Sequence, residues 1–450
     1  MVKALLLSTY ELGRQPFGLA SPAAWLRAAG AVVTCLDVSL QSFDEDAVRA
    51  AELIAFYLPM HTATRIAART LERVRRLNPR AHLCAYGLYA PLNADWLRES
   101  GVATILGGEF ESGLAQLARE LSSPRQASQN GLISLQRQQF LVPDRRGLPA
   151  LGNYARLALP DGRRKVVGYT EASRGCKHLC RHCPIVPVYQ GRFRIVQREI
   201  VLEDIRRQVA AGAQHITFGD PDFFNGVGHA LAIVRELHRE HPALTYDVTI
   251  KVEHLLKHAR HLPALRDTGC AFVTSAVESV DDHVLTLLEK GHTRADFVRV
   301  ARMFQDVDLV LSPTFVAFTP WITLQGYADL LQTICDLGLV DHVAPVQLCI
   351  RLLITGGSRL LQLPEVGRLI GEFDPAALCY RWRHPDPRVD TLQHDIEALV
   401  RKGGADGCDR RSIFEQAWRL LRGAMDANAP TMPLLPARAA IPYLTEPWYC

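Results

Sequence analysis

Three cysteines lie close together near the middle of the chain: Cys176, Cys180 and Cys183, with three and then two residues between them. Three thiolates on one tight loop can bind three irons of a [4Fe–4S] cube, and because no fourth cysteine lies nearby, the fourth iron stays open to another ligand. A structural zinc site usually has two cysteine or cysteine–histidine pairs, and one pair is missing here. We therefore predict an iron–sulfur cluster at this loop, with His178 and His182 as exposed neighbours.

The run from Glu171 to Cys183, Glu-Ala-Ser-Arg-Gly-Cys-Lys-His-Leu-Cys-Arg-His-Cys, closely resembles the cluster-binding loop of the radical S-adenosylmethionine (radical SAM) family. In that family the open iron binds the amino and carboxylate groups of S-adenosylmethionine. The resemblance therefore implies a [4Fe–4S] cluster and S-adenosylmethionine as cofactors, with a protein electron donor of the flavodoxin or ferredoxin type. It also implies a partial (β/α)6 barrel.

The composition fits a large globular protein. With 450 residues, of which 48% are hydrophobic, the chain is long enough for two or three domains. No apolar run approaches the roughly 20 residues of a membrane span, and the start of the chain turns polar by Ser8, unlike a signal peptide. The 51 basic and 47 acidic residues give a net charge of +4 without basic runs, and the eleven scattered cysteines indicate reduced thiols. We expect a cytoplasmic protein with no membrane or nucleic-acid partner.

The first 120 residues alternate apolar runs with amphipathic stretches, the pattern of a parallel sheet flanked by helices. The predicted strands are Lys3–Ser8, Val32–Asp37, Leu53–Leu58, His82–Tyr86 and Val102–Leu106. The predicted helices are Pro22–Ala29, Asp46–Ala51, Thr64–Leu77, Asn93–Ser100 and Ser112–Leu121. Five strands in a doubly wound order predict a flavodoxin-like α/β domain over residues 1–125. With Arg14–Ala20 and Gly107–Glu111, this order resembles the cobalamin-binding-type domain that precedes many radical SAM barrels.

The sequence leaves open whether this domain binds cobalamin. Where such domains supply a histidine ligand, it lies in an Asp-x-His-x-x-Gly motif after the first strand, and Tyr10–Gln15 contains no histidine. Some relatives bind cobalamin without this ligand, and others have the domain without the cofactor. His61 follows the third predicted strand, at the sheet edge where ligands collect, or else it simply begins a helix.

Three further regions follow. Residues 126–162 are polar and irregular, which predicts a linker. Residues 163–355 alternate strands with helices, which predicts the parallel barrel, and Arg351, on a candidate sixth strand, is a candidate carboxylate ligand. The predicted barrel strands are Val166–Thr170, His215–Gly219, Thr245–Val252, Ala271–Ala276 and Leu309–Phe315. We expect residues 356–450 to form a mostly helical C-terminal extension, and its tail ends in cysteine.

Acidic residues follow two predicted barrel strands, at the ends where ligands collect in such barrels. Asp220 and Asp222 lie in Gly219–Phe224, where the family resemblance implies a segment near the amino group of S-adenosylmethionine, and a carboxylate there can pair with the ammonium. The alternative is that Asp-Pro-Asp simply makes a turn. Glu278 and Ser279 match a Glu-Ser pair that the family places close to the cofactor's sugar or amino acid, and a buried glutamate is costly unless it is paired.

The tail, Tyr443–Cys450, resembles that of a radical SAM subgroup in which Cys-Cys-Ala-Glu-Pro or Cys-selenocysteine-Ala-Glu-Pro follows. The chain stops at the first cysteine of that pattern, which suggests a selenocysteine codon read as a stop; an accidental terminal cysteine is the alternative. The same subgroup resembles the arsinothricin-biosynthesis enzyme that transfers the 3-amino-3-carboxypropyl group of S-adenosylmethionine to trivalent arsenic. A tail thiol is a soft ligand suited to a metalloid, so Cys450, with Cys408 or Cys379, is a candidate catalytic residue.

We therefore predict a radical SAM enzyme that cleaves S-adenosylmethionine reductively and forms a new bond on a small-molecule substrate. Cleavage at one carbon–sulfur bond gives a 5′-deoxyadenosyl radical, and cleavage at another releases the 3-amino-3-carboxypropyl group; the sequence does not distinguish them. One alternative is a cobalamin-assisted radical methyltransferase. An alternative of another class is a non-catalytic iron–sulfur or cobalamin sensor, for which no helix-turn-helix pattern or basic arm is evident.

Overall fold

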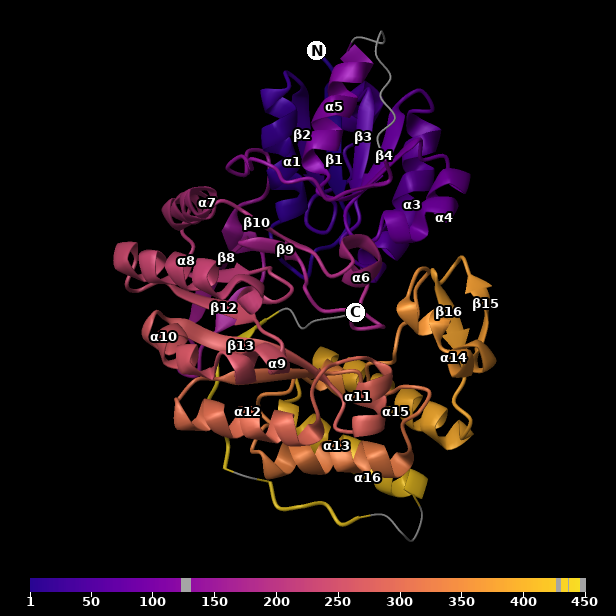
Figure 1. The fold of residues 1–450 in the computed structure, drawn as a ribbon. Coiled ribbons are helices and arrows are strands. Elements are labelled where there is room, and N and C mark those ends of the chain that lie inside the picture. Colours follow the sequence, from indigo (N-terminus) through magenta and orange to yellow (C-terminus); the bar gives the residue numbers. More distant parts are fainter. Residues whose placement is uncertain (123–130, 426–429, 436, 446–450) are drawn as a thin grey trace.

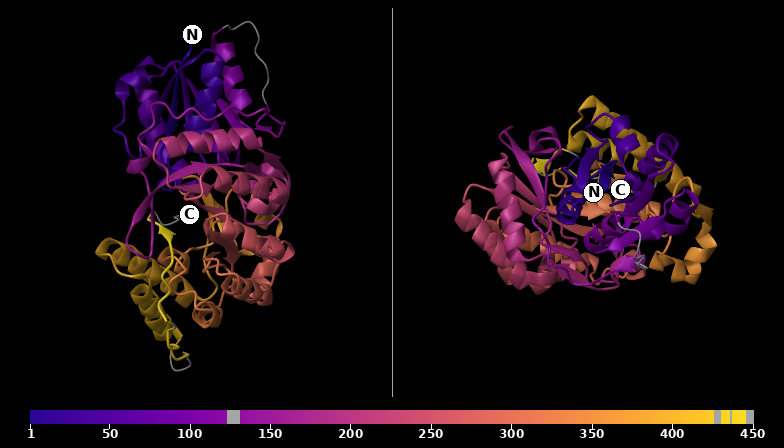
Figure 2. Two further views of the ribbon diagram at one scale, coloured as in Figure 1. Left: turned by 90° about the vertical axis from the view of Figure 1, so that its left-hand side faces the viewer. Right: turned by 90° about the horizontal axis from the view of Figure 1, so that it is seen from above.

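The computed structural model describes residues 1–122, 131–425, 430–435 and 437–445. An N-terminal sheet with its helices lies above a second, larger sheet, and the C-terminal helices pack beside and below the second sheet (Figures 1 and 2). Within the described ranges, no helix is both long enough and apolar enough to cross a bilayer.

The N-terminal sheet has the strand order β2-β1-β3-β4-β5-β6, and its strands pair in parallel. The strands are β1 (Lys3–Ser8), β2 (Val32–Asp37), β3 (Leu53–Tyr57), β4 (His82–Tyr86), β5 (Thr104–Gly108) and β6 (Ile133–Ser134). One face packs against α1 (Phe17–Ala28) and α5 (Glu111–Ser122), and the other against α2 (Glu45–Ala50), α3 (His61–Leu77) and α4 (Ala94–Glu99). Because both faces are covered, the strands are almost uniformly apolar, and the predicted flavodoxin-like fold is confirmed.

The second sheet is a curled half-barrel with the order β14-β13-β12-β11-β8-β7-β17. Its parallel strands are β8 (Arg164–Thr170), β11 (His215–Phe218), β12 (Thr245–Thr249), β13 (Cys270–Glu278) and β14 (Leu311–Phe315); β7 (Arg156–Ala158) and β17 (Tyr443–Leu444) add an antiparallel edge. The outer helices are α7 (Arg198–Ala210), α8 (Val227–Glu240), α10 (Leu262–Asp267), α12 (Arg294–Asp306) and α13 (Leu324–Asp336). The predicted partial barrel is confirmed. In the described residues its sixth strand is reduced to one parallel bridge between Phe318 and Arg351.

The C-terminal part is mostly helical, as predicted, but it also contains an antiparallel hairpin. Its elements are α14 (Pro364–Leu369), β15 (Ile370–Asp374), β16 (Cys379–Trp382), α15 (Pro387–Asp406) and α16 (Arg410–Met425). Helix α16 buries Phe414 and Trp418 in the same hydrophobic core as the outer helices of the barrel. The extension is therefore continuous with the barrel core rather than an independent unit.

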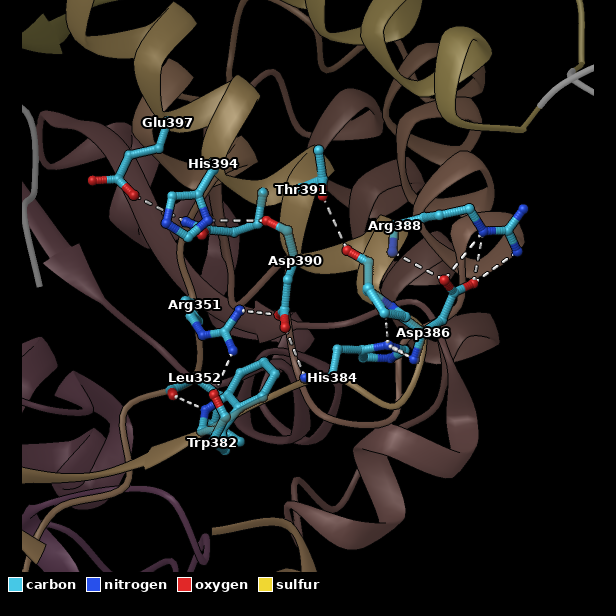
Figure 3. Close-up of polar contacts among 12 residues, drawn as sticks. Arg351, Leu352, Trp382, His384, Asp386, Arg388, Asp390, Thr391, His394 and Glu397 are labelled. Carbon is cyan, nitrogen blue, oxygen red and sulfur yellow. Dashed lines mark hydrogen bonds and ion pairs between the residues drawn. The ribbon is translucent and has the colours of Figure 1, made fainter. Parts of the chain in front are cut away.

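Arg351 joins the hairpin to helix α15. Its guanidinium carbon lies 3.4 Å from the centre of the Trp382 ring, and its nitrogens donate to the Trp382 carbonyl and to Asp390 Oδ1, each at 2.7 Å (Figure 3). Trp382 Nε1 donates to the Leu352 carbonyl at 2.8 Å. The carboxylate that Arg351 binds is thus one of the protein's own, contributed by Asp390.

Arg351→Lys should loosen the hairpin, because lysine lacks the planar fork that reaches a carbonyl and a carboxylate together. We expect amide hydrogen exchange in residues 379–382 to become about tenfold faster, which corresponds to about 1.4 kcal/mol of local stability. Arg381→Lys is the matched control, since the Arg381 side chain is 72% exposed. Equal exchange rates in R351K and the wild type would contradict this role.

Candidate cluster-binding site

The three cysteines lie in residues 176–184, which we call the cluster loop, between β9 (Ser173–Gly175) and α6 (Ile185–Tyr189). Strand β9 pairs antiparallel with β10 (Phe193–Ile195), and this pairing closes the base of the loop. The entry to the loop requires glycine, because Gly175 has a φ of +74° and a β-carbon there would lie 2.4 Å from the Tyr189 ring. The backbone can therefore enter the cluster loop in this conformation only with glycine at position 175.

The three thiols fit an iron–sulfur cluster in number and surroundings. None is in a disulfide; Cys180 is buried, and Cys176 and Cys183 are partly buried. Burial raises the pKa of Cys176 to about 11 and that of Cys183 to about 12, and the neighbouring Cys180 raises both. Metal binding has to displace these thiol protons, and the ammonium group of Lys290 opposes the pKa increase at Cys183. The donor set therefore fits a cluster held by three thiolates.

Each histidine of the cluster loop pairs with an acid that follows or ends a barrel strand. His178 Nε2 lies 3.4 Å from Asp222 Oδ2, and His182 Nε2 lies 3.2 Å from Glu278 Oε1. The two imidazole side chains are only 13% and 14% exposed, so the prediction that they are exposed neighbours was wrong. The sequence could not reveal these pairs, because each joins residues that are far apart in the chain and meet only when the barrel forms.

Asp222 has protein partners on both carboxylate oxygens. Oδ1 accepts a hydrogen bond from the Phe224 amide at 3.1 Å, and Oδ2 lies 2.7 Å from Nδ1 of His254, on helix α9 (Val252–Lys257). A ligand atom from each of Asp222, His178 and Cys176 lies within 4.8 Å of the others. Asp222 therefore lies immediately beside the first cluster cysteine, on the barrel side of the loop.

Asp220 binds the strand that leads into the cluster loop. Oδ1 accepts from Ser173 Oγ at 2.5 Å, and Oδ2 accepts from the Ala172 amide at 2.9 Å. Burial raises the pKa of Asp220 to about 7, against the effect of these hydrogen bonds. Because both oxygens are used, Asp220 fixes the position of β9.

Glu278 lies at a strained point of the sheet. Its φ is +69°, and the pairing of β13 with β14 skips Val277 just before it, which is a β-bulge. Oε1 accepts from Lys290 Nζ at 3.2 Å. Burial alone would raise the pKa of Glu278, but Lys290 and His182 lower it to about 2. These contacts use Oε1, which leaves Oε2 for a ligand; next to it, Ser279 Oγ accepts from the Asp281 amide at 3.1 Å.

The start of the C-terminal extension holds the outer side of the cluster loop. Arg359 donates to the Leu179 carbonyl at 2.6 Å, and Ser358 donates to the Arg181 carbonyl at 3.1 Å. Arg181 and Arg359 both pair with Glu289, at 2.9 and 3.0 Å. These residues could not be predicted from the sequence, because a surface arginine carries no signal of the backbone carbonyls that it will meet.

The N-terminal sheet holds the loop from the opposite side through a buried group of charges. Arg174, two residues before Cys176, pairs with Glu171 and Glu111 at 2.6 Å each and lies 3.6 Å from Glu109. Burial alone would lower the pKa of Arg174, but the three carboxylates raise it. We call these four residues the Arg174 cluster. Glu109 and Glu111 follow β5, so the cluster ties the N-terminal sheet directly to the loop.

The carboxyl ends of the N-terminal strands are covered by the rest of the chain. The final residues of β1 to β5 are all buried: Ser8, Asp37, Tyr57, Tyr86 and Gly108. Tyr154 donates to Asp37 Oδ2 at 2.9 Å, and His61 Nε2 lies 2.7 Å from the Ala377 carbonyl in the β15–β16 turn. The histidine that the sequence singled out therefore binds the C-terminal hairpin.

The candidate thiols of the C-terminal part are spread over separate elements. Cys379 begins β16 and is partly buried, whereas Cys408 is exposed just after α15. Cys450 lies outside the described residues.

Residues 170–320 match the radical SAM superfamily. They form a radical SAM domain. The matched segment begins at the last residue of β8, contains the cluster loop, Asp220, Asp222 and Glu278, and ends after β14. A radical SAM domain implies a [4Fe–4S] cluster and S-adenosylmethionine, in agreement with the three-thiol loop.

Curated relatives match the radical SAM domain at low identity. The ribosomal protein uS12 methylthiotransferase RimO of Syntrophotalea carbinolica is 28% identical over 178 residues, which is 36% of this chain and 38% of the relative. The tRNA-2-methylthio-N(6)-dimethylallyladenosine synthase of Desulfosudis oleivorans is 26% identical over 195 residues, 40% of this chain and 38% of the relative. The chain thus spans well under half the length of these relatives.

Solved structures resemble the fold over a longer stretch. OxsB, a cobalamin-dependent S-adenosylmethionine radical enzyme solved with aqua-cobalamin and S-adenosylmethionine, superposes with a TM-score of 0.67 at 12% identity, over 90% of this chain and 67% of that chain. TsrM of Kitasatospora setae, a radical S-adenosylmethionine methyltransferase solved with cobalamin and a [4Fe–4S] cluster, gives a TM-score of 0.55 at 17% identity, over 74% of this chain and 70% of that chain. The likeness to OxsB extends over both sheets.

The residues of this chain do not fit cobalamin at the strand ends of the N-terminal sheet. A corrin ring there would need exposed surface, but these strand ends are buried and bonded to the chain itself. The Tyr57 ring lies against Gly18, where a β-carbon would be 2.1 Å from it, and Tyr86 donates to the Gly18 carbonyl at 2.8 Å. A ligand of this size would have to displace these aromatic rings and the Arg174 cluster.

The protein should therefore retain far less than one equivalent of cobalamin. After anaerobic incubation with excess hydroxocobalamin and gel filtration, we expect the visible spectrum to show the iron–sulfur cluster without the corrin bands. TsrM treated in parallel serves as the positive control. Stoichiometric retention of cobalamin by this chain would show that the covered sheet edge opens.

The Arg174 cluster predicts a pH dependence of stability. Burial raises the pKa of Glu109 from about 4.5 to about 7, so between these values the folded protein keeps a proton that the unfolded chain has lost. The contribution of this proton to the free energy of unfolding is fully present at low pH and is lost as the pH rises through 7. The loss is on the order of 3 kcal/mol. Glu109→Gln, which is permanently neutral, should lose less stability than the wild type between pH 5 and 8.

Thermal unfolding at a series of pH values measures this difference. Glu111→Gln is the comparison: it weakens the 2.6 Å pair with Arg174 and should lower the melting temperature at every pH, but it keeps Glu109 as a titrating group, so its stability should still fall as the pH rises. Parallel curves for E109Q and the wild type would exclude Glu109 as the titrating group.

Proposed function

We propose that this chain is a radical SAM enzyme that cleaves S-adenosylmethionine reductively and forms a new bond on a small-molecule substrate. The observation that carries the proposal is the cluster loop, where three thiols lie between acids of the barrel and ion pairs from both flanking parts of the chain. A reduced cluster, once bound, supplies one electron to the sulfonium of S-adenosylmethionine. The proposed electron donor is a protein of the flavodoxin or ferredoxin type.

In this proposal Cys176, Cys180 and Cys183 hold three irons. Glu278 and Ser279 bind the sugar or amino-acid part of S-adenosylmethionine, which is supported by the Glu278 Oε2 that the protein contacts leave unused. Asp222 lies beside Cys176, and in this proposal the ammonium group would share its Oδ2 with the imidazoles of His178 and His254.

The other charged residues position this set. Asp220 holds the backbone before the loop, Lys290 keeps Glu278 ionised, and Arg174 and Arg359 prevent the loop from moving away from the barrel. We divide the chain into an N-terminal scaffold (1–125), a linker (126–162), the barrel (163–355) and the C-terminal extension (356–450).

The specific reaction that we propose is transfer of the 3-amino-3-carboxypropyl group to trivalent arsenic. It is supported by the resemblance of Tyr443–Cys450 to the tail of the subgroup described above. Strand β17, which begins this tail, pairs with β7 at the edge of the barrel sheet, and the Thr445 amide donates to the Arg156 carbonyl at 2.8 Å. In this proposal Cys450 delivers the metalloid, with Cys408 or Cys379 as a second thiol.

Two other functions make different predictions. A cobalamin-assisted methyltransferase is favoured by the likeness to OxsB and TsrM, but its cofactor would have to displace side chains that bury the described strand ends of the N-terminal sheet. A non-catalytic iron–sulfur sensor would bind the cluster and leave S-adenosylmethionine intact.

Anaerobic turnover with mass spectrometry separates these functions. The reconstituted protein, reduced by dithionite or a flavodoxin and given S-adenosylmethionine with arsenite, should form methylthioadenosine and an arsenic-containing amino acid. 5′-Deoxyadenosine would indicate cleavage at the other carbon–sulfur bond, and S-adenosylhomocysteine a methylation. No cleavage at all would support the sensor.

Cys180→Ala tests the cluster assignment. The wild type should bind about four irons per chain, whereas C180A should lose most of the iron, the visible absorption of the cluster and all cleavage of S-adenosylmethionine. Cys84→Ala, which changes a buried cysteine of β4 in the N-terminal sheet, is the matched control and should keep them. A C180A protein with full iron content would refute the assignment.

A further inference from the structure

The inner face of the half-barrel differs from a packed barrel core. Strand residues alternate between the two faces of a sheet. Ile216, Phe218 and Val248 pack under the outer helices, so the residues between them point to the inner face. In closed parallel barrels such inner positions are filled mainly by branched apolar side chains. Here the inner positions of β11 to β14 include Thr217, Asp247, Thr249, Thr274, Ser312 and Thr314.

Three of these hydroxyl groups form a row across neighbouring strands. Thr249 of β12 is the register partner of Thr274 in β13, which is the partner of Ser312 in β14. Adjacent strands lie about 4.8 Å apart, so a small molecule over the central Thr274 lies within about one strand spacing of both neighbouring hydroxyls. All three residues are partly exposed, and within the described part of the chain their side chains make no hydrogen bond. Thr314, one inner position further along β14, has the same properties.

Asp247 adds a fixed carboxylate to the same face. Oδ1 accepts from Thr217 Oγ1 at 2.6 Å and from His215 Nε2 at 2.8 Å. His215 Nδ1 lies 2.8 Å from Thr245 Oγ1, which accepts from Lys165 Nζ at 3.1 Å. One histidine tautomer, with its proton on Nε2, satisfies every donor and acceptor in this chain of contacts. Because these contacts use only Oδ1, Asp247 is oriented by the protein and keeps Oδ2 for a ligand.

This arrangement selects a class of ligand. The carboxylate of Asp247 only accepts hydrogen bonds, whereas each hydroxyl of the row can donate one and accept others. A bound molecule therefore has to donate to Asp247, and its O–H groups can both donate to and accept from the row. The carboxylate disfavours anions such as phosphate esters, and the row of Thr and Ser side chains has no aromatic ring for stacking a base. The spacing of the row suits a compact molecule.

We propose that Asp247 and the row Thr249, Thr274 and Ser312 bind the second substrate, a compact uncharged molecule with several O–H donors. The choice of probe rests on the function proposed above: trivalent arsenic in neutral water is As(OH)3, which has three O–H donors on one small centre. Binding through hydrogen bonds keeps the three As–O bonds intact, whereas capture by thiols replaces them with As–S bonds.

Steady-state kinetics of the reconstituted holoenzyme tests the row. Thr274→Val keeps the shape of the side chain and removes its hydroxyl, as Ser312→Ala removes the next one; each should raise KM for arsenite about three- to tenfold. Asp247→Asn should raise it about tenfold or more, because the amide cannot replace the charged acceptor. Thr333→Val, on the outer helix α13, is the matched control. Unchanged KM values in T274V, S312A and D247N would overturn the proposal.

Anomalous scattering from arsenic in crystals of the holoenzyme soaked with arsenite tests the site without turnover. An arsenic peak within hydrogen-bond reach of Asp247 and Thr274 that is absent in crystals of T274V/S312A would support the binding site. If the peak is present but no arsenic product forms, only the proposed reaction fails. Arsenic bound solely at cysteine sulfur, or no peak at all, would overturn the site. If the variants form the arsenic product with a normal KM, the proposed reaction is correct but the proposed binding site is wrong.

Discussion

The buried guanidinium of Arg174 is the contact on which the arrangement of the whole molecule depends. A charge without solvent is tolerated only when partners surround it, and its partners come from both sides of the domain boundary: Glu171 from the barrel, Glu109 and Glu111 from the N-terminal sheet. Since Arg174 immediately precedes Gly175 and Cys176, the same contact sets the start of the cluster loop. Docking of the two sheets and placement of the first cluster ligand are therefore one event.

The two sheets use their ligand-binding surfaces in opposite ways. In the N-terminal sheet, the strand ends that hold cofactors in doubly wound folds are buried under Tyr154, the β15–β16 turn and the sheet's own tyrosines. In the barrel, the inner face keeps partly exposed hydroxyls and a carboxylate with one unused oxygen. Likeness to OxsB and TsrM thus describes the shared fold, whereas the side chains determine which of the two surfaces remains open.

The C-terminal extension contributes to the site from outside the radical SAM domain. Arg359 and Ser358 bind carbonyls of the cluster loop, and the hairpin that Arg351 holds reaches His61 in the N-terminal sheet. The extension therefore contacts both other parts of the chain. A domain match over residues 170–320 therefore covers the three cysteines but not Ser358 and Arg359, which bind the loop from outside the matched segment.

The sequence by itself determined the spacing of the three cysteines, the order of strands and helices, and the acids after barrel strands, because each depends on local spacing or on apolar periodicity that survives without three-dimensional information. Only the tertiary structure decided what those acids bind: Asp220 holds a backbone, Asp222 and Glu278 meet the loop histidines that the sequence suggested were exposed, and Lys290 lies beside Glu278. It also decided that the strand ends of the first sheet are covered and that the barrel has a polar inner face. These features join residues distant in the chain, and their partners exist only when both sheets and the C-terminal extension have assembled.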